Sequence, residues 1–187
     1  MTTTSAPSPS PDPDSGTLIE FGGLPGTGKS TLARHLAQRT GAVLLRVDEI
    51  EAAMRRNDLT ANQTGIAAYS VAHDLAASHL RRGLTVIADA VNPVEAPRAA
   101  WRELARDCGA RHEVVEAHCS DTAEHRRRVD HRAASHTHDL PGWSYPTWPE
   151  VQRRAEEYQP RTDERLVVDA AGPIDAGHRQ VALYLGL

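Results

Sequence analysis

The segment from Gly23 to Thr31 reads Gly-Leu-Pro-Gly-Thr-Gly-Lys-Ser-Thr. It matches the phosphate-binding loop (P-loop) pattern G-x-x-x-x-G-K-[ST], in which glycines, a lysine and a hydroxyl residue stand at fixed spacing. An apolar run at 17–21 precedes this segment and a helical pattern at 29–39 follows it, so the segment joins a strand to a helix. This unit constrains the fold more than any other feature, because it directs the start of a helix at a bound phosphate.

Each type of residue in the loop has an expected role. Glycines let backbone N–H groups approach a phosphate, where a Cβ atom would block the approach. Lys29 is expected to place a positive charge beside the β- and γ-phosphates, and the Ser30 hydroxyl is an oxygen ligand suited to Mg²⁺. The sequence therefore predicts binding of ATP and Mg²⁺ by a loop that contains Gly23, Gly26, Thr27, Gly28, Lys29, Ser30 and Thr31.

Length and composition narrow the function classes. The 187 residues fit one domain, and a net charge of −4 makes nucleic acid an unlikely partner. Since no apolar run is long enough to cross a bilayer and no signal-peptide pattern is present, we expect a cytoplasmic protein without a membrane partner. Two cysteines are too few for a disulfide framework or a zinc site. Residues 1–15 consist almost entirely of Thr, Ser, Pro, Ala and Asp, which predicts a disordered tail before a folded domain at 16–187.

Short apolar runs alternate with helical patterns along the rest of the chain. Apolar strands without polar alternation are typical of a parallel sheet covered on both faces, and intervening helices favour right-handed crossovers. We therefore predict a three-layer α/β/α P-loop domain, an α/β fold with a five-stranded parallel sheet and ligands at the carboxyl ends of the strands. The expected strands are 17–21, 42–47, 84–88, 112–118 and 165–168, and the expected helices are 29–39, 49–56, 66–81, 97–108, 122–134, 149–158 and 176–185.

Two carboxylates stand at the predicted ends of strands. Asp48 follows the second strand, where it could accept the proton of an attacking hydroxyl or cap the next helix. Asp89 ends the third strand, which is the usual place for the acid that holds Mg²⁺. The sequence leaves open which of the two is the base. Asn92 lies in the turn after Asp89, where it could face a substrate.

A helical lid is predicted at about 121–158. Arg128 and Arg132 are four residues apart on one helical face, where they could neutralise charge on a transferring phosphoryl group. The alternative is a solvated helix in which Glu124 pairs with Arg128. The long Gly- and Pro-containing loop that follows favours a lid. His136 and His138 in that loop lack further ligands for a metal site.

Taken together, these motifs resemble the small P-loop kinases of the AAA-domain and nucleotide-kinase-like group, which includes chloramphenicol phosphotransferase, gluconate kinase and the polynucleotide kinase domain. The resemblance covers about residues 17–185. It implies that Asp48 is the catalytic base, that Arg128 and Arg132 are lid arginines, and that the loop at 168–173, which contains Gly172, lies beside the adenine. Polynucleotide kinases carry an arginine three residues after the catalytic Asp, whereas this chain has Glu51.

The resulting expectation is a kinase that transfers the γ-phosphoryl group of ATP to a hydroxyl of an antibiotic, sugar or nucleoside. Glu51 makes a polyanionic acceptor less favourable and a neutral or cationic one more so. Two alternatives stay open, a nucleic-acid 5′-end kinase and a regulatory P-loop ATPase. The net charge and Glu51 disfavour the first, and the sequence shows no partner surface for the second.

Overall fold

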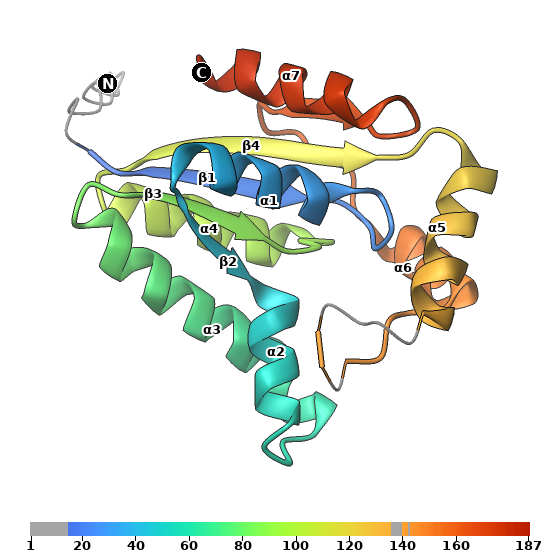
Figure 1. Cartoon of the computed structure of the whole chain (residues 1–187). Helices are drawn as coiled ribbons and strands as arrows, with labels where there is room; N and C mark the ends of the chain where they lie inside the picture. Colours follow the sequence, from blue (N-terminus) through green and yellow to red (C-terminus); the bar gives the residue numbers. More distant parts are fainter. Residues whose placement is uncertain (1–14, 136–139, 142) are drawn as a thin grey trace, which may run out of the picture.

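A computed structural model describes residues 15–135, 140, 141 and 143–187. Five parallel strands form one sheet in the order β2-β3-β1-β4-β5 (Figure 1). This confirms the predicted α/β P-loop fold with a five-stranded parallel sheet. The predicted tail, apart from Ser15, and the pair His136 and His138 lie outside the described residues. The strands are β1 Thr17–Gly22, β2 Val43–Arg46, β3 Thr85–Asp89, β4 Arg111–His118 and β5 Leu166–Asp169.

Helices cover both faces of the sheet. On one face, α1 and α7 close a core around Phe21, Leu32 and Val168. On the other, α3 and α4 close a core around Leu18, Trp101 and alanines of α3. Within the described residues, no helix combines the length and apolarity needed to span a membrane. The helices are α1 Lys29–Thr40, α2 Val47–Arg55, α3 Ala61–Leu80, α4 Glu95–Asp107, α5 Thr122–Ala134, α6 Trp148–Glu157 and α7 Ile174–Leu185.

Strand register brings the functional ends together. Phe21 of β1 and Arg46 of β2 both lie beside Asp89 of β3, so the P-loop, Asp89 and the start of α2 share one edge of the sheet. Figure 1 shows α5 and α6 beyond the arrowheads of β1 and β4, at this same edge. The carboxyl ends of the strands therefore carry all of the candidate site residues.

Local signals explain most helix boundaries. Gly41 and Gly83 adopt the left-handed conformation with φ of 72° and 75°, as expected for residues after helix ends. The predicted start of α3 at residue 66 was wrong by five residues. A capping box, in which the side chains of Thr60 and Gln63 each bond the other residue's backbone, starts this helix at Ala61.

Candidate active site

The P-loop joins β1 to α1 with three glycines in the left-handed region. The φ angles are 129° at Gly23, 85° at Gly26 and 89° at Gly28. A Cβ atom on Gly23 would lie 2.2 Å from the carbonyl oxygen of Ala117, and one on Gly26 would lie 2.6 Å from Cγ2 of Val129. Side chains are thus excluded on steric grounds at both positions. The residues present fit an anion cradle at the start of α1.

Asp89 lies between two cations at the end of β3. Its carboxylate is 3.8 Å from Nζ of Lys29 and 3.3 Å from Nε of Arg46. All three side chains are buried, with at most 7% exposed. Within the described part of the chain, both Asp89 oxygens are buried and accept no hydrogen bond of good geometry. These oxygens fit a role as ligands of Mg²⁺ or its bound water, together with Ser30.

Asp48 is the second residue of α2 rather than the last residue of a strand. Arg46 holds the N-cap position, and no side chain caps this helix, so the capping role considered for Asp48 is not observed. Asp48 lines two cavities at once. One, of about 530 Å³, also contains Lys29 and Arg132 in its wall, and the other, of about 710 Å³, lies between α3 and α4. Asp48 therefore stands where the cavity beside Lys29 meets the 710 Å³ cavity.

A third cavity, of about 580 Å³, lies on the other side of the P-loop. Gly28, Ser30 and Thr31 form one wall, and Gly172 lies opposite in the loop after β5. Ala170 of that loop is 3.3 Å from the position of a Cβ atom on Gly28, so the two loops are in close contact. The structure thus brings the P-loop and the predicted adenine loop together around one space. Arg128 and Arg132 complete its wall from α5.

Helix α5 contacts the P-loop directly. His125 is buried, and its Nε2 lies 2.8 Å from the carbonyl oxygen of Pro25, which requires this nitrogen to be the donor. Arg128 donates a 2.7 Å hydrogen bond to Glu124, so the ion pair considered as an alternative exists, and Arg128 also lines a cavity. Hydrogen bonds from Arg127 and Arg128 lower the pKa of Glu124 to about 2. The anchored Arg128 is therefore held toward the P-loop.

Aromatic residues of the 121–158 segment contact arginine or histidine side chains. The guanidinium of Arg132 lies 4.1 Å from the ring centre of Tyr145, and that of Arg55 lies 4.8 Å from the ring centre of Trp143. Trp148 meets His125 edge to face at 5.2 Å. Tyr145 and Trp143 also line the 530 Å³ cavity. Trp101, by contrast, is fully buried in the core between the sheet and α4.

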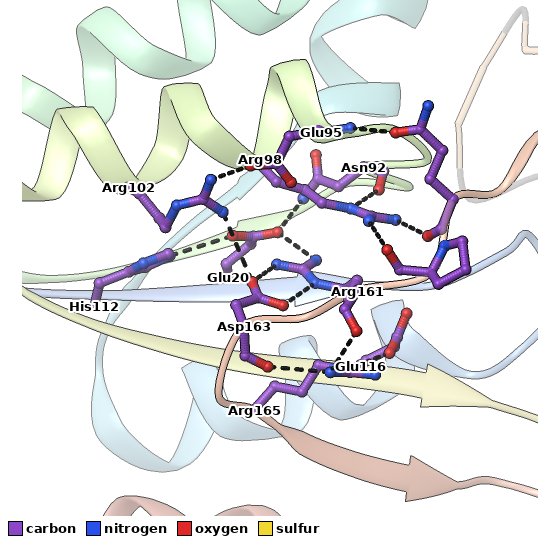
Figure 2. A network of polar contacts seen from close by, with 12 residues as sticks. Glu20, Asn92, Glu95, Arg98, Arg102, His112, Glu116, Arg161, Asp163 and Arg165 are labelled. Carbon is purple, nitrogen blue, oxygen red and sulfur yellow. Dashed lines mark hydrogen bonds and ion pairs between the residues drawn. The ribbon is translucent and has the colours of Figure 1, made fainter.

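A buried polar network joins β1, α4 and the segment after α6 (Figure 2). Glu20, in the middle of β1, is fully buried and pairs with Arg161 at 2.8 Å and with His112 at 3.2 Å. Burial alone would raise the pKa of Glu20, but His112 and Arg161 outweigh it, so the pKa lies below its ordinary value. Asn92 donates a 2.9 Å hydrogen bond to Glu20. The suggestion that Asn92 faces a substrate was wrong, because Glu20 holds this amide in the core.

The same network fastens the loop after β3. Arg98 of α4 donates to the carbonyl oxygen of Asn92 (Figure 2). It also donates to the carbonyl oxygens of Pro93 and of Gln159, which lies beyond α6. The backbone N–H of Gln159 donates a 2.8 Å hydrogen bond to Pro93. Sequence reasoning missed this network. The available signal was the charged Glu20 in an otherwise apolar strand, which requires a buried partner.

A family model described as the AAA domain matches residues 18–142, which is more than half of the chain. The chain belongs to this AAA-domain family. The match confirms the predicted resemblance, and the P-loop of this family implies nucleotide binding. One protein from Mycobacterium bovis and two from Mycobacterium tuberculosis, all described as uncharacterized, are 33% identical to the chain over 119 residues. The match covers 57% of this chain and 24% of each relative, so the chain matches about a quarter of their length.

Solved structures share the fold across nearly the whole chain. A protein of Chloroflexus aurantiacus proposed to be a kinase superposes with a TM-score of 0.74 at 18% identity, covering 91% of this chain and 98% of that one. Kti12 of Chaetomium thermophilum in complex with ADP-AlF3 superposes with a TM-score of 0.70 at 17% identity, covering 90% of this chain and 97% of that one. A gluconokinase of Sinorhizobium meliloti gives 0.64 at 18% identity, with 91% of each chain covered. At these identities the likeness establishes the fold alone.

Proposed function

We propose that this chain is a kinase that transfers the γ-phosphoryl group of ATP to a hydroxyl of a small organic molecule of the antibiotic, sugar or nucleoside type. In this proposal, residues 16–187 form one kinase domain and the segment 121–158 is its lid. The proposal is supported chiefly by the position of Asp48 on the wall of both the Lys29 cavity and the 710 Å³ cavity. Similarity to a gluconokinase and to a protein proposed to be a kinase adds support at the level of the fold.

The nucleotide would occupy the 580 Å³ cavity, with its phosphates at the P-loop and its adenine beside the loop that contains Gly172. Lys29 would hold the β- and γ-phosphates as a buried cation. Arg128 and Arg132 would neutralise charge that develops on the transferring group. Mg²⁺, held through Ser30 and Asp89, would supply further charge neutralisation when bound.

The acceptor would occupy the 710 Å³ cavity with its hydroxyl near Asp48. Asp48 would take the hydroxyl proton as the acceptor oxygen bonds to the γ-phosphorus. The bond between that phosphorus and the β–γ bridging oxygen would break, and ADP would leave with the electron pair. Such a transfer needs a base that lies close to both ATP and the acceptor. Asp48 meets this requirement because it lines both cavities.

The test is ATP turnover by the purified chain, with Mg²⁺, in the presence and absence of a panel of hydroxyl compounds. A kinase should release ADP slowly alone and much faster with an acceptor. Asp48→Asn should keep ATP affinity close to wild type and lower kcat by a factor on the order of 10²–10⁴. Asp58→Asn, in the exposed turn after α2, is the matched control and should leave ATP affinity and kcat unchanged.

Other results would replace the proposal. Stimulation by nucleic-acid 5′ ends alone would indicate an end kinase. Rapid ATP hydrolysis that no acceptor accelerates would indicate a regulatory ATPase. Normal turnover per folded molecule in Asp48→Asn would remove this residue from the chemistry.

A further inference from the structure

The 710 Å³ cavity has a composition that selects among small molecules. Its walls are Gly65, Ile66 and Tyr69 of α3, Ala96 and Ala100 of α4, and Pro93 of the loop between β3 and α4. The volume lies within the range of about 300–1,000 Å³ that suits a drug-sized ligand. Ile66 is 86% exposed at this wall. An apolar ligand in the cavity would bury it.

The backbone carbonyls at the α4 side of this cavity are already used. The carbonyl oxygen of Asn92 accepts from Arg98 (Figure 2), and that of Pro93 accepts from Arg98 and from the N–H of Gln159. Pro93 and Pro97 have no N–H to donate. Between α3 and α4 the polar side chains of the lining are Tyr69, Ser70 and His73, so a sugar there would bury more hydroxyls than these groups can pair, and each unpaired hydroxyl costs free energy. This part of the wall therefore favours an apolar body over a polyol.

Charge at the cavity is negative on balance. Three carboxylates line it, Asp48, Glu51 and Glu157, and Arg154 is the only Lys or Arg among the described residues that do. Glu51 accepts hydrogen bonds of 2.5 and 3.1 Å from Arg55, and this ion pair offsets its charge. Asp48 and Glu157, set against Arg154, leave one negative charge in excess. A phosphate or sulfate on the acceptor would meet like charge, whereas one positive charge would be attracted.

We propose that this cavity binds a compact apolar alcohol, neutral or with one positive charge, and that it excludes sugars and phosphorylated or sulfated acceptors. The proposal rests on the proposed kinase function for the transfer step, but not for binding. The hydroxyl of such a ligand lies toward Asp48, while the apolar body lies between α3 and α4. Of the acceptor classes considered above, this proposal therefore leaves compact apolar alcohols and removes sugars.

Gly65 offers a way to fill the cavity without disturbing the fold. A Cβ atom built on Gly65 meets no heavy atom within 4 Å, so this helical glycine faces open space in the described structure. Gly65→Ala should not lower Tm, because alanine is favoured over glycine inside a helix. Gly65→Leu should extend into the cavity and compete with a ligand. Ala61→Leu, exposed at the start of the same helix and absent from the cavity wall, is the matched control.

The binding experiment uses calorimetry with the full chain and two sets of probes. The apolar set consists of two alcohols with an apolar body, 4-phenylbutan-1-ol and the cationic amino alcohol phenylalaninol. The polar set consists of glucose, gluconate and glucose 6-phosphate. We expect binding from the apolar set alone, and Gly65→Leu should weaken it by about tenfold or more, which corresponds to 1.4 kcal/mol. Ala61→Leu should leave it unchanged. Binding by the polar set, no binding by the apolar set, or an unaffected Gly65→Leu variant would each overturn the proposal.

Phosphoryl transfer to the same probes separates this inference from the kinase function. Transfer to glucose or gluconate but not to the apolar set would leave the kinase function standing and refute the acceptor class. Apolar binding that Gly65→Leu weakens, without transfer to any compound, would support the cavity assignment and refute the kinase function. If both proposals hold, an apolar alcohol should be phosphorylated, and Gly65→Leu should raise KM for that alcohol while KM for ATP stays unchanged.

Discussion

The buried pair of Arg161 and Glu20 allows a quantitative test of what stabilises the sheet beside the loop after β3. Both side chains are fully buried, and Arg161→Met would leave the Glu20 carboxylate without its guanidinium partner. Breaking a buried pair in this way costs about 3–5 kcal/mol. Asn92 and His112 still contact Glu20, so we expect the lower end, about 3 kcal/mol. With a urea m-value of about 2 kcal/mol/M, the unfolding midpoint should fall by about 1.5 M.

The loss should depend on pH with a defined sign. In the wild type the pKa of Glu20 lies below its ordinary value of 4.5, so the pair contributes stability above that pH and loses it as the pH falls further. In Arg161→Met, burial without the arginine should raise the pKa of Glu20. As the pH falls, protonation of Glu20 removes its unpaired buried charge in the variant. The difference in unfolding free energy between wild type and Arg161→Met should therefore shrink from pH 7 to pH 5. Adding Glu20→Gln to the variant should recover part of the loss at pH 7.

The control is Arg102→Met. Arg102 is 38% exposed and pairs with Glu95 and more distantly with Asp163, so its loss should cost only about 0.2–1 kcal/mol. Urea denaturation followed by circular dichroism measures both variants. If the midpoint for Arg161→Met falls no further than that for Arg102→Met, or if the gap does not narrow at low pH, the buried pair does not have the role argued above.

Three further outcomes are expected. Gly26→Ala should weaken ATP binding by about tenfold or more in calorimetry, since its Cβ would lie 2.6 Å from a side chain of α5; Gly41→Ala, with a similar φ and open surroundings, should leave ATP affinity unchanged. Arg128→Ala and Arg132→Ala should each lower kcat more than they weaken nucleotide binding, and equal losses in steady-state kinetics would count against a lid. Burial lowers the pKa of His73, so stability should fall as the pH drops below about 6.5, and the slope in urea denaturation should be flatter in His73→Gln.

Much of the fold could be predicted from the sequence because its signals are local. The P-loop pattern, apolar strands and glycines after helix ends each depend on a few neighbouring residues, and the sheet agrees with them. Strand order could not be read, since parallel strands of similar composition can pair in several orders. The start of α3 was missed because the capping box at Thr60 precedes the apolar pattern by several residues.

The site was predictable only where one motif holds both the residue and its role. Lys29 and Ser30 lie within the P-loop motif, whose spacing gives their positions, while their roles stay predictions. The structure brings Lys29 to 3.8 Å from Asp89. The Glu20 network could not, because Arg161 is 141 positions away in the sequence. Likewise, nothing near Gly65 in the sequence indicates that it lines a cavity, because the opposite wall is formed by residues of α4.

The structure also bears on the choice between the two carboxylates, which the sequence left open. A general base must reach the hydroxyl that it deprotonates. Asp89 is 3% exposed, lies between Lys29 and Arg46, and is absent from the described walls of both the 710 Å³ cavity and the 530 Å³ cavity. Asp48, in the first turn of α2, lines both. Position alone therefore favours Asp48 as the base, and leaves Asp89 suited to ordering Lys29 and a metal ion beside the phosphates.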